Sequence, residues 1–304
     1  MHIQTVTGPV SLDMLGMIDG HAHAWIDPPE NAPTRLELND ERAIADELRA
    51  FREAGGSALV DCQPGGCGRD ANRLRTISAA SGVYITATSG FHQQMYYPPD
   101  HWLWSSDIET AAAYFRREVG DGMDETGIPA TTLKVGYEGV TGGQTGCLMQ
   151  AVAQVAAETG TLVLFHTERG ANVEALLPFF DASGVPPSQL YLCHVDKRPD
   201  FGLHRELAQA GVMLGYDTFV RPKYDPDQGV WVLLRQMVDA GYAGQIAICQ
   251  DRALSSMWRY QGDPQGMTEL ALSIRSRLEG EGFDDETCKQ LLGGNIARYL
   301  VRRA

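Results

Sequence analysis

Short apolar runs alternate with helical stretches along most of the chain. Residues Asn39–Ala54 begin with polar capping residues, end before Gly55-Gly56, and are followed by the run SALVDC. Glycine ends helices readily because it reaches the left-handed backbone conformation without a steric penalty. Six later helical stretches end in the same way, at Gly82, Gly120, Gly160, Gly184, Gly211 and Gly241. The pattern therefore predicts helices that are each followed closely by a strand.

Eight such strand-like runs occur, and most of them are continuously apolar. They are GMIDGH, SALVDC, VYITATSG, TTLKVG, TLVLFH, QLYLCH, VMLGYD and QIAICQD. Continuous apolar runs are typical of parallel strands that are covered on both faces. Eight strand–helix units predict an α/β fold closed into a (β/α)8 TIM barrel, with the active site at the carboxyl ends of the strands. An open doubly wound sheet is the alternative, but no GxGxxG follows the first run.

Length and composition agree with one such barrel. A chain of 304 residues suits it, and we expect one domain over residues 1–304, in which residues 1–16 form a hairpin capping the barrel bottom. The net charge of −14 argues against nucleic-acid or anionic-membrane partners. The six cysteines form no CxxC pair, and no leader or membrane-spanning run is evident. We expect a cytoplasmic protein that acts on a small molecule.

Metal-binding side chains stand at the ends of five of these runs. They are His21, His23, Lys134, His166, His194 and Asp251. His21 and His23 are two residues apart, so they point to the same side of a strand. Because the carboxyl ends of barrel strands meet at one face, we expect all six side chains to converge there. Together they predict a site for two divalent metals and a base.

Lys134 and Asp251 carry the chemistry that the histidines do not. A buried lysine is costly unless it is neutral or paired. A neutral amine near metals can capture carbon dioxide, and the resulting carbamate can bridge two cations; a salt bridge to Glu138 is the alternative. Asp251 can bind a metal and accept a proton from metal-bound water. Its alternative role is to cap a helix or to pair with Arg252.

The order of these motifs resembles the phosphotriesterase family of the amidohydrolase superfamily, which includes lactonase-like members. The similarity covers nearly the whole chain and rests on GHAHAWI, SGFHQQMYYPPD, MDETGIPATTLKVG, LFHTERG, LYLCHVD, LGYDTF, ICQD and GGNIARYL. It implies that His21, His23 and Asp251 hold the more buried metal, and that His166 and His194 hold the other. Zinc is the expected metal, with manganese, cobalt or iron as alternatives. A homodimer is also implied, but no feature of the sequence demonstrates one.

The resemblance further implies a hydrolase with a carboxylated Lys134 and a hydroxide that bridges the two metals. This hydroxide would attack a lactone or another carboxylic ester, with an anionic substituent as an option. Asp251 would take the proton and pass it outward through His194 or His92. Three alternatives stay open: phosphoester hydrolysis with the same metals, a binding protein on a catalytically silent barrel, and a mononuclear member with an unmodified lysine.

Substrate contacts are expected from the loops that follow the strands. His92 stands where lactone-hydrolysing relatives often carry tyrosine, and an arginine found after the seventh strand of some lactonases is absent from residues 217–219. Among the loop cations, Lys223 and Arg252 are the first choices to bind an anionic group. Trp102 and Trp258 are candidates to cover the substrate, or else they pack on the barrel rim.

Overall fold

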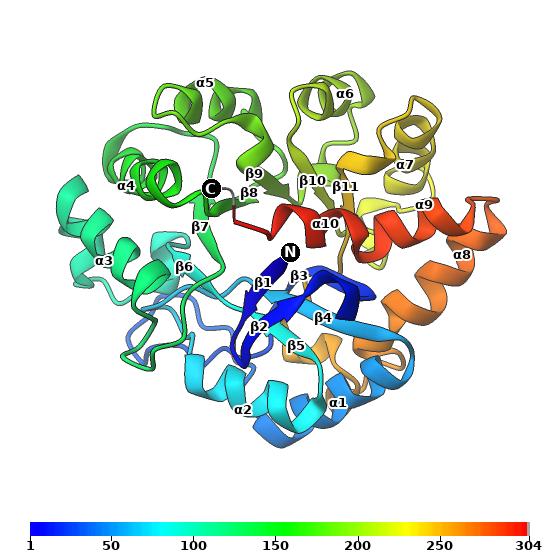
Figure 1. The fold of residues 1–304 in the computed structure, drawn as a ribbon, viewed down its shortest axis with the longest axis horizontal. Helices are drawn as coiled ribbons and strands as arrows, with labels where there is room; N and C mark the ends of the chain where they lie inside the picture. The colour runs from blue at the N-terminus through cyan, green and yellow to red at the C-terminus, as the bar shows by residue number, and fades with distance from the viewer. Residues whose placement is uncertain (303–304) are drawn as a thin grey trace.

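Nine strands form a parallel barrel in the computed structural model, which describes residues 1–302 (Figure 1). Residues 303 and 304, the last two of the predicted domain 1–304, lie outside the described residues. The strands are β3 (Met17–Ala22), β4 (Gly56–Asp61), β5 (Tyr84–Thr86), β6 (Thr88–Gly90), β7 (Thr132–Tyr137), β8 (Leu162–Thr167), β9 (Leu190–Cys193), β10 (Met213–Tyr216) and β11 (Ile246–Ile248). The predicted barrel is confirmed.

The third predicted run is divided into two short strands. β5 pairs with β4, and β6 pairs with β7, so this single run joins a three-stranded and a six-stranded parallel sheet. Gly90, the last residue of β6, has φ +90°, and a Cβ there would fall 2.1 Å from the carbonyl oxygen of Lys134. Glycine is therefore required for the chain to pass this closely over β7.

Ten α-helices accompany the strands within residues 1–302, and most of them lie around the outside of the barrel (Figure 1). They are α1 (Glu41–Glu53), α2 (Ala71–Ser81), α3 (Ile108–Gly120), α4 (Gly143–Thr159), α5 (Leu176–Asp181), α6 (Phe201–Gln209), α7 (Val230–Asp239), α8 (Arg275–Gly280), α9 (Asp285–Lys289) and α10 (Asn295–Tyr299). The carboxylates of Asp40, Asp70 and Asp107 cap α1, α2 and α3 by accepting a backbone N–H. Gly82 and Gly160 end α2 and α4 in the left-handed conformation that the sequence predicted.

Apolar side chains fill the barrel and close its base. The antiparallel strands β1 (His2–Thr5) and β2 (Gly8–Ser11) lie with α10 across the centre of the ring in Figure 1. Ile3 from β1 and Ile296 from α10 pack in one cluster with the interior side chains of Ile18, Val60 and Leu164. This end is therefore plugged by packing, and polar side chains are concentrated at the other end.

The first and last strands are joined mainly through side chains. The backbone N–H of Asp251 donates to the carbonyl oxygen of His21 over 2.9 Å. The carboxylate of Asp19, on β3, accepts from the side-chain amide of Gln250 over 3.0 Å and from its backbone N–H over 3.3 Å. Burial raises the pKa of Asp19 to about 7. These contacts fix His21 and Asp251 beside each other, although they are 230 positions apart in the sequence.

His204 offers a test of the packing behind β10. Its Nδ1 accepts from the hydroxyl of Tyr216 over 2.7 Å, and its Nε2 donates to the carbonyl oxygen of Arg198 over 3.0 Å. Burial lowers the pKa of His204 from 6.5 to about 4. The unfolded chain therefore binds this proton more tightly than the folded chain does. The contribution of His204 to the free energy of unfolding is complete above about pH 6.5 and is lost as the pH falls toward 4.

We expect His204→Gln to weaken the pH dependence of stability. The wild-type chain should lose up to about 3 kcal/mol from this group between about pH 6.5 and 4, and the variant should not. Urea unfolding of the chelator-treated protein across this range measures the difference, with the exposed His2→Gln as the control. If the free energy of unfolding changed equally with pH in the wild type and in His204→Gln, His204 would not be the source of the pH dependence.

Candidate metal centre

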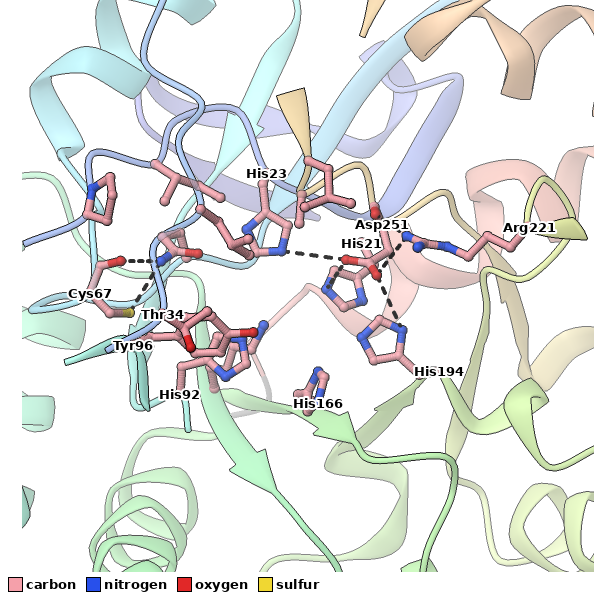
Figure 2. A pocket seen from close by; sticks show the side chains of 17 residues that line it. His21, His23, Thr34, Cys67, His92, Tyr96, His166, His194, Arg221 and Asp251 are labelled. Carbon is pink, nitrogen blue, oxygen red and sulfur yellow. Dashed lines mark hydrogen bonds and ion pairs between the residues drawn. The ribbon is translucent and has the colours of Figure 1, made fainter. Parts of the chain in front are cut away.

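All six predicted metal residues line one cavity of about 230 Å³ at the carboxyl ends of the strands (Figure 2). They come from five different strands or from the residues that follow them, which are β3, β7, β8, β9 and β11. The alternation within β3 places His21 and His23 on the same side, as their spacing predicted. Lys134 lies in the middle of β7 and is fully buried.

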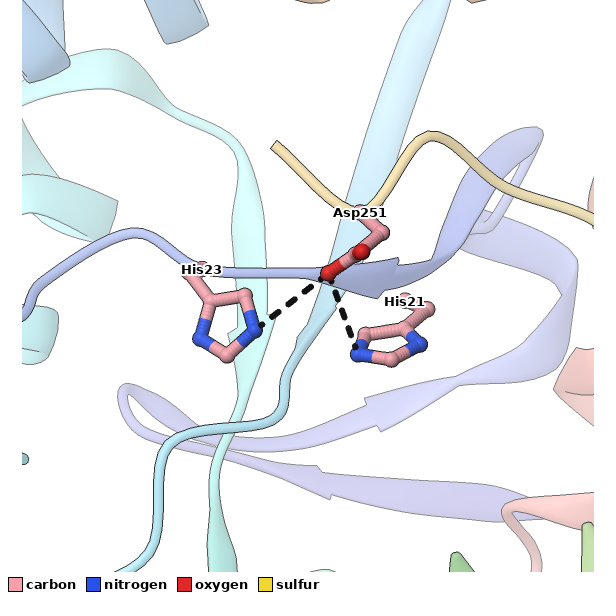
Figure 3. A group of neighbouring side chains, drawn as sticks. All are labelled: His21, His23 and Asp251. Carbon is pink, nitrogen blue, oxygen red and sulfur yellow. Dashed lines mark ion pairs between the residues drawn. The ribbon is translucent and has the colours of Figure 1, made fainter. Parts of the chain in front are cut away.

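His21, His23 and Asp251 have the spacing of ligands around one cation. The Oδ1 atom of Asp251 lies 3.6 Å from His21 Nε2 and 3.7 Å from His23 Nε2 (Figure 3). These separations are too long for good hydrogen bonds. Two ligands that are each about 2.1 Å from a tetrahedral ion are about 3.4 Å apart. The separations of these atoms therefore suit joint binding of one divalent cation better than direct hydrogen bonds between the side chains.

Several buried polar atoms in this cavity have no hydrogen-bond partner within residues 1–302. They are Nδ1 and Nε2 of His21, Nδ1 of His23, Nε2 of His166 and Nζ of Lys134. A buried polar atom without a partner costs about 1–3 kcal/mol, so several in one place indicate that something else satisfies them. Imidazole nitrogens and carboxylate oxygens are ligands for divalent metals, and the donor set fits such ions.

The histidines have the protonation state that metal binding requires. Burial lowers the pKa of His21, His23 and His194 well below the usual value, and neighbouring positive groups lower it further. Neutral imidazole is the form that binds a metal. Burial also raises the pKa of Asp251, whereas the Arg221 guanidinium acts in the opposite direction.

His166 and His194 form the other side of the cluster. Their ring centroids are 4.8 Å apart, and the ring of His194 lies 4.6 Å from that of His21 (Figure 2). Burial lowers the pKa of His166, as it lowers that of His21, and the Glu168 carboxylate acts in the opposite direction on His166. Lys134 lines the same cavity as both rings. The assignment of individual ligands stays a prediction.

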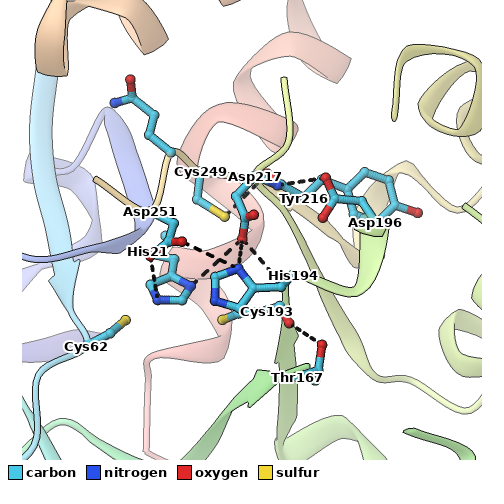
Figure 4. Close-up of polar contacts among 12 residues, drawn as sticks. His21, Cys62, Thr167, Cys193, His194, Asp196, Tyr216, Asp217, Cys249 and Asp251 are labelled. Carbon is cyan, nitrogen blue, oxygen red and sulfur yellow. Dashed lines mark hydrogen bonds and ion pairs between the residues drawn. The ribbon is translucent and has the colours of Figure 1, made fainter. Parts of the chain in front are cut away.

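Asp217 is a site residue that the sequence analysis did not select. Its Oδ2 atom lies 2.5 Å from Nδ1 of His194 and 4.0 Å from Nδ1 of His21 (Figure 4). Asp196 holds Asp217 in place by accepting hydrogen bonds from the backbone N–H groups of Asp217 and Thr218, over 2.9 and 2.8 Å. One signal was available, because Asp217 ends the run VMLGYD just as Asp251 ends QIAICQD.

We expect Asp217→Asn to weaken metal binding without unfolding the protein. A carboxylate on Nδ1 holds the imidazole so that Nε2 is left for a metal, and losing such a partner costs about 10- to 100-fold in metal affinity. Competition with a chelator measures the change. The exposed Asp239→Asn serves as the control. An unchanged affinity in Asp217→Asn would show that Asp217 does not orient His194.

The predicted substrate residues are only partly brought together. His92 lines the cavity, and the other four do not appear in its lining within the described residues. Arg252 is 1% exposed, donates to Gln250 over 3.0 Å and forms an ion pair with Glu269 over 2.5 Å. Trp258 is buried and donates to the carbonyl oxygen of Arg252 over 2.9 Å. This arginine and tryptophan therefore stabilise the last loop.

Lys223 and Trp102 lie on the surface. The Lys223 ammonium lies 4.9 Å from the ring centroid of Tyr224, and Trp102 is 41% exposed and packs edge-on against Tyr114. Arg221, a cation of the same loop that the sequence analysis did not select, lines the cavity together with Lys134. Its Nη2 atom lies 2.9 Å from Oδ2 of Asp251 (Figure 2). The position after a strand therefore did not show which side chain of this loop turns toward the cavity.

Comparisons with known proteins agree with this fold. The model of the Phosphotriesterase family matches residues 1–300, and the chain belongs to this family. It is 25% identical to the phospho-furanose lactonase of Mycoplasmopsis synoviae (strain 53) over 98% of this chain and 91% of that protein. It is 24% identical to the N-acetyltaurine hydrolase of Rattus norvegicus over 98% of this chain and 97% of that protein.

The fold also matches a solved structure over its whole length. The crystal structure of the lactonase Lmo2620 from Listeria monocytogenes superposes with a TM-score of 0.93 at 22% identity, covering 100% of both chains. The protein is thus a hydrolase of the phosphotriesterase family with histidine and aspartate groups arranged for metal binding. None of the helices within residues 1–302 is long and apolar enough to cross a membrane.

Proposed function

We propose that this protein hydrolyses a lactone or another carboxylic ester that carries an anionic group, using two divalent metal ions. The observation that carries the proposal is the cavity itself, which is lined both by unpartnered ligand atoms and by Arg221. Lys134, carboxylated at Nζ, would join the two metal positions, and zinc is the simplest choice of metal. Such ions would polarise the scissile carbonyl group and lower the pKa of a water molecule.

The protein side chains would divide the remaining work. Asp251 would accept a proton from the attacking water and return it to the leaving oxygen. Arg221 would hold the anionic group of the substrate, because a guanidinium forms strong paired hydrogen bonds with carboxylate or phosphate. Ile26, Leu36 and Leu254 line the same cavity and would cover the apolar part of a small substrate.

A specific observation favours carboxamides as the second candidate. One relative is named for the hydrolysis of N-acetyltaurine, an amide that carries a sulfonate. The same metal site could cleave either bond, and an anionic group occurs in this amide and in a phosphorylated lactone alike. The two candidates differ in the leaving group. Amide hydrolysis releases an amine, which must be protonated as it departs. In lactone hydrolysis the leaving alkoxide stays attached to the rest of the opened ring.

A substrate panel with the zinc-loaded protein tests the proposal. The panel includes lactones with and without a phosphate or carboxylate group, N-acyl sulfonates and aryl phosphoesters. We expect the largest kcat/KM for the anionic lactones; a larger value for the amides or the phosphoesters would overturn the order. Full metal occupancy without any turnover would favour a binding protein, and one metal per chain would favour a mononuclear site.

We expect Arg221→Met to raise KM for anionic lactones by about 10- to 100-fold, because a hydrogen bond to a charged group contributes about 1.5–3 kcal/mol. Neutral lactones should change much less in KM, which separates lost anion binding from a general disturbance of Asp251. Lys223→Met is the matched control, since it removes a cation from the same loop but outside the cavity lining. Equal effects on neutral and anionic substrates would contradict an anion-binding role.

A further inference from the structure

His92 is held rigidly at one wall of the cavity. It follows β6, and its backbone N–H donates to the hydroxyl of Tyr97 over 3.0 Å. The backbone of His92 also passes close to Gly136 on β7. Only glycine allows this, since a Cβ at position 136 would fall 2.5 Å from the carbonyl carbon of His92. The imidazole ring lies between Tyr96 and His166, at centroid distances of 4.5 and 5.1 Å (Figure 2). Backbone and ring are both fixed.

One backbone hydrogen bond determines where the proton of this imidazole lies. The N–H of Gln93 donates to Nδ1 of His92 over 2.8 Å. A backbone amide nitrogen can only donate, so Nδ1 must carry a lone pair rather than a hydrogen. A protonated imidazole has no lone pair left to accept with, which means that the ring is neutral. Its single proton must therefore be on Nε2.

We propose that His92 is a fixed hydrogen-bond donor, through Nε2–H, to the substrate oxygen on which negative charge develops during hydrolysis. This inference rests on the proposed function and names a role within the same site. A donor that is already in place stabilises such an oxygen strongly, because no reorganisation is needed during the reaction. The same geometry excludes His92 as the outward proton carrier that the sequence analysis considered, since neither ring nitrogen is free to accept.

Two matched substitutions separate a donor from a base. In His92→Asn the side-chain oxygen can still accept from the N–H of Gln93, but the donor at the tip of the ring is removed. In His92→Gln the amide NH2 group reaches about the position of Nε2, so the donor is kept. We expect kcat to fall by about 10²- to 10³-fold in His92→Asn and by less than about tenfold in His92→Gln. A comparable loss in both variants would overturn the proposal.

A spectroscopic measurement tests the same claim without relying on turnover. Long-range 15N–1H NMR of 15N-histidine-labelled, zinc-loaded protein distinguishes the two neutral tautomers and the charged ring, and the spectrum of His92→Asn assigns the His92 signals. We expect the neutral Nε2–H tautomer at pH 7.5 and unchanged metal content in both variants. An Nδ1–H tautomer or a charged ring would overturn the proposal. Absence of turnover in the wild type with the expected tautomer would instead refute the proposed function.

Discussion

Replacing Lys134 by alanine should abolish hydrolysis while the barrel stays folded. Lys134 is fully buried in β7, and its Nζ has no hydrogen-bond partner among residues 1–302, so removing the amine breaks no internal hydrogen bond. The loss instead removes the group that would join the two metal positions. Because metals supply several kcal/mol of transition-state stabilisation, we expect kcat/KM to fall by about 10³-fold or more.

Metal analysis and chemical rescue make this prediction specific. The variant should bind less than the two metals expected for the wild type, and a small carboxylate such as acetate should restore part of the activity by occupying the vacated space. Lys289→Ala is a suitable control, since this exposed lysine is in α9 at the other end of the barrel. A Lys134→Ala protein with two metals and normal turnover would show that Lys134 is only structural.

Asp251→Asn should be nearly as damaging, and asparagine is the informative replacement. Asp251 has φ +47°, in the left-handed region that asparagine tolerates and alanine does not. The substitution thus keeps the backbone but removes the negative charge that faces His21 and His23. Losing a general base alone costs about 10²- to 10⁴-fold in rate.

Steady-state kinetic assays on the anionic lactones measure this loss of rate, and circular dichroism checks the fold. The exposed Asp227→Asn provides the control. We also expect weaker retention of metal in Asp251→Asn, because one of the three ligand atoms around the buried position becomes a poor donor. Activity within tenfold of the wild type would rule out Asp251 as the proton acceptor.

The sequence allowed much of the fold to be predicted because the barrel repeats a local signal. Several helices begin at a capping residue such as Asp40 or end at a glycine such as Gly82, and the strands are contiguous apolar runs. The repeat of eight units is therefore visible without long-range information. The division of the third run into β5 and β6 was not visible, because it depends on how Gly90 packs against Lys134 across the strands.

The strand-end side chains that gather in the cavity could be placed by the same logic, whereas the loop side chains that line it could not. A residue at the end of a barrel strand must face the carboxyl end, so His166 and Asp251 could be placed from the sequence alone. A loop side chain has no such constraint. The side chain of Arg252 forms an ion pair with Glu269, and that of Arg221 forms one with Asp251. The direction of each side chain depends on a partner that is distant in the sequence.

The amino-acid sequence by itself thus determined the barrel and the set of strand-end side chains that gather at its mouth, because short-range sterics and apolar periodicity specify strand direction. Only the tertiary structure decided which arginine enters the cavity, which acid supports His194, and which nitrogen of His92 carries a proton. The reason is physical: side-chain direction in a loop and the tautomer of a ring are set by individual contacts in space, and those contacts exist only after the chain has folded.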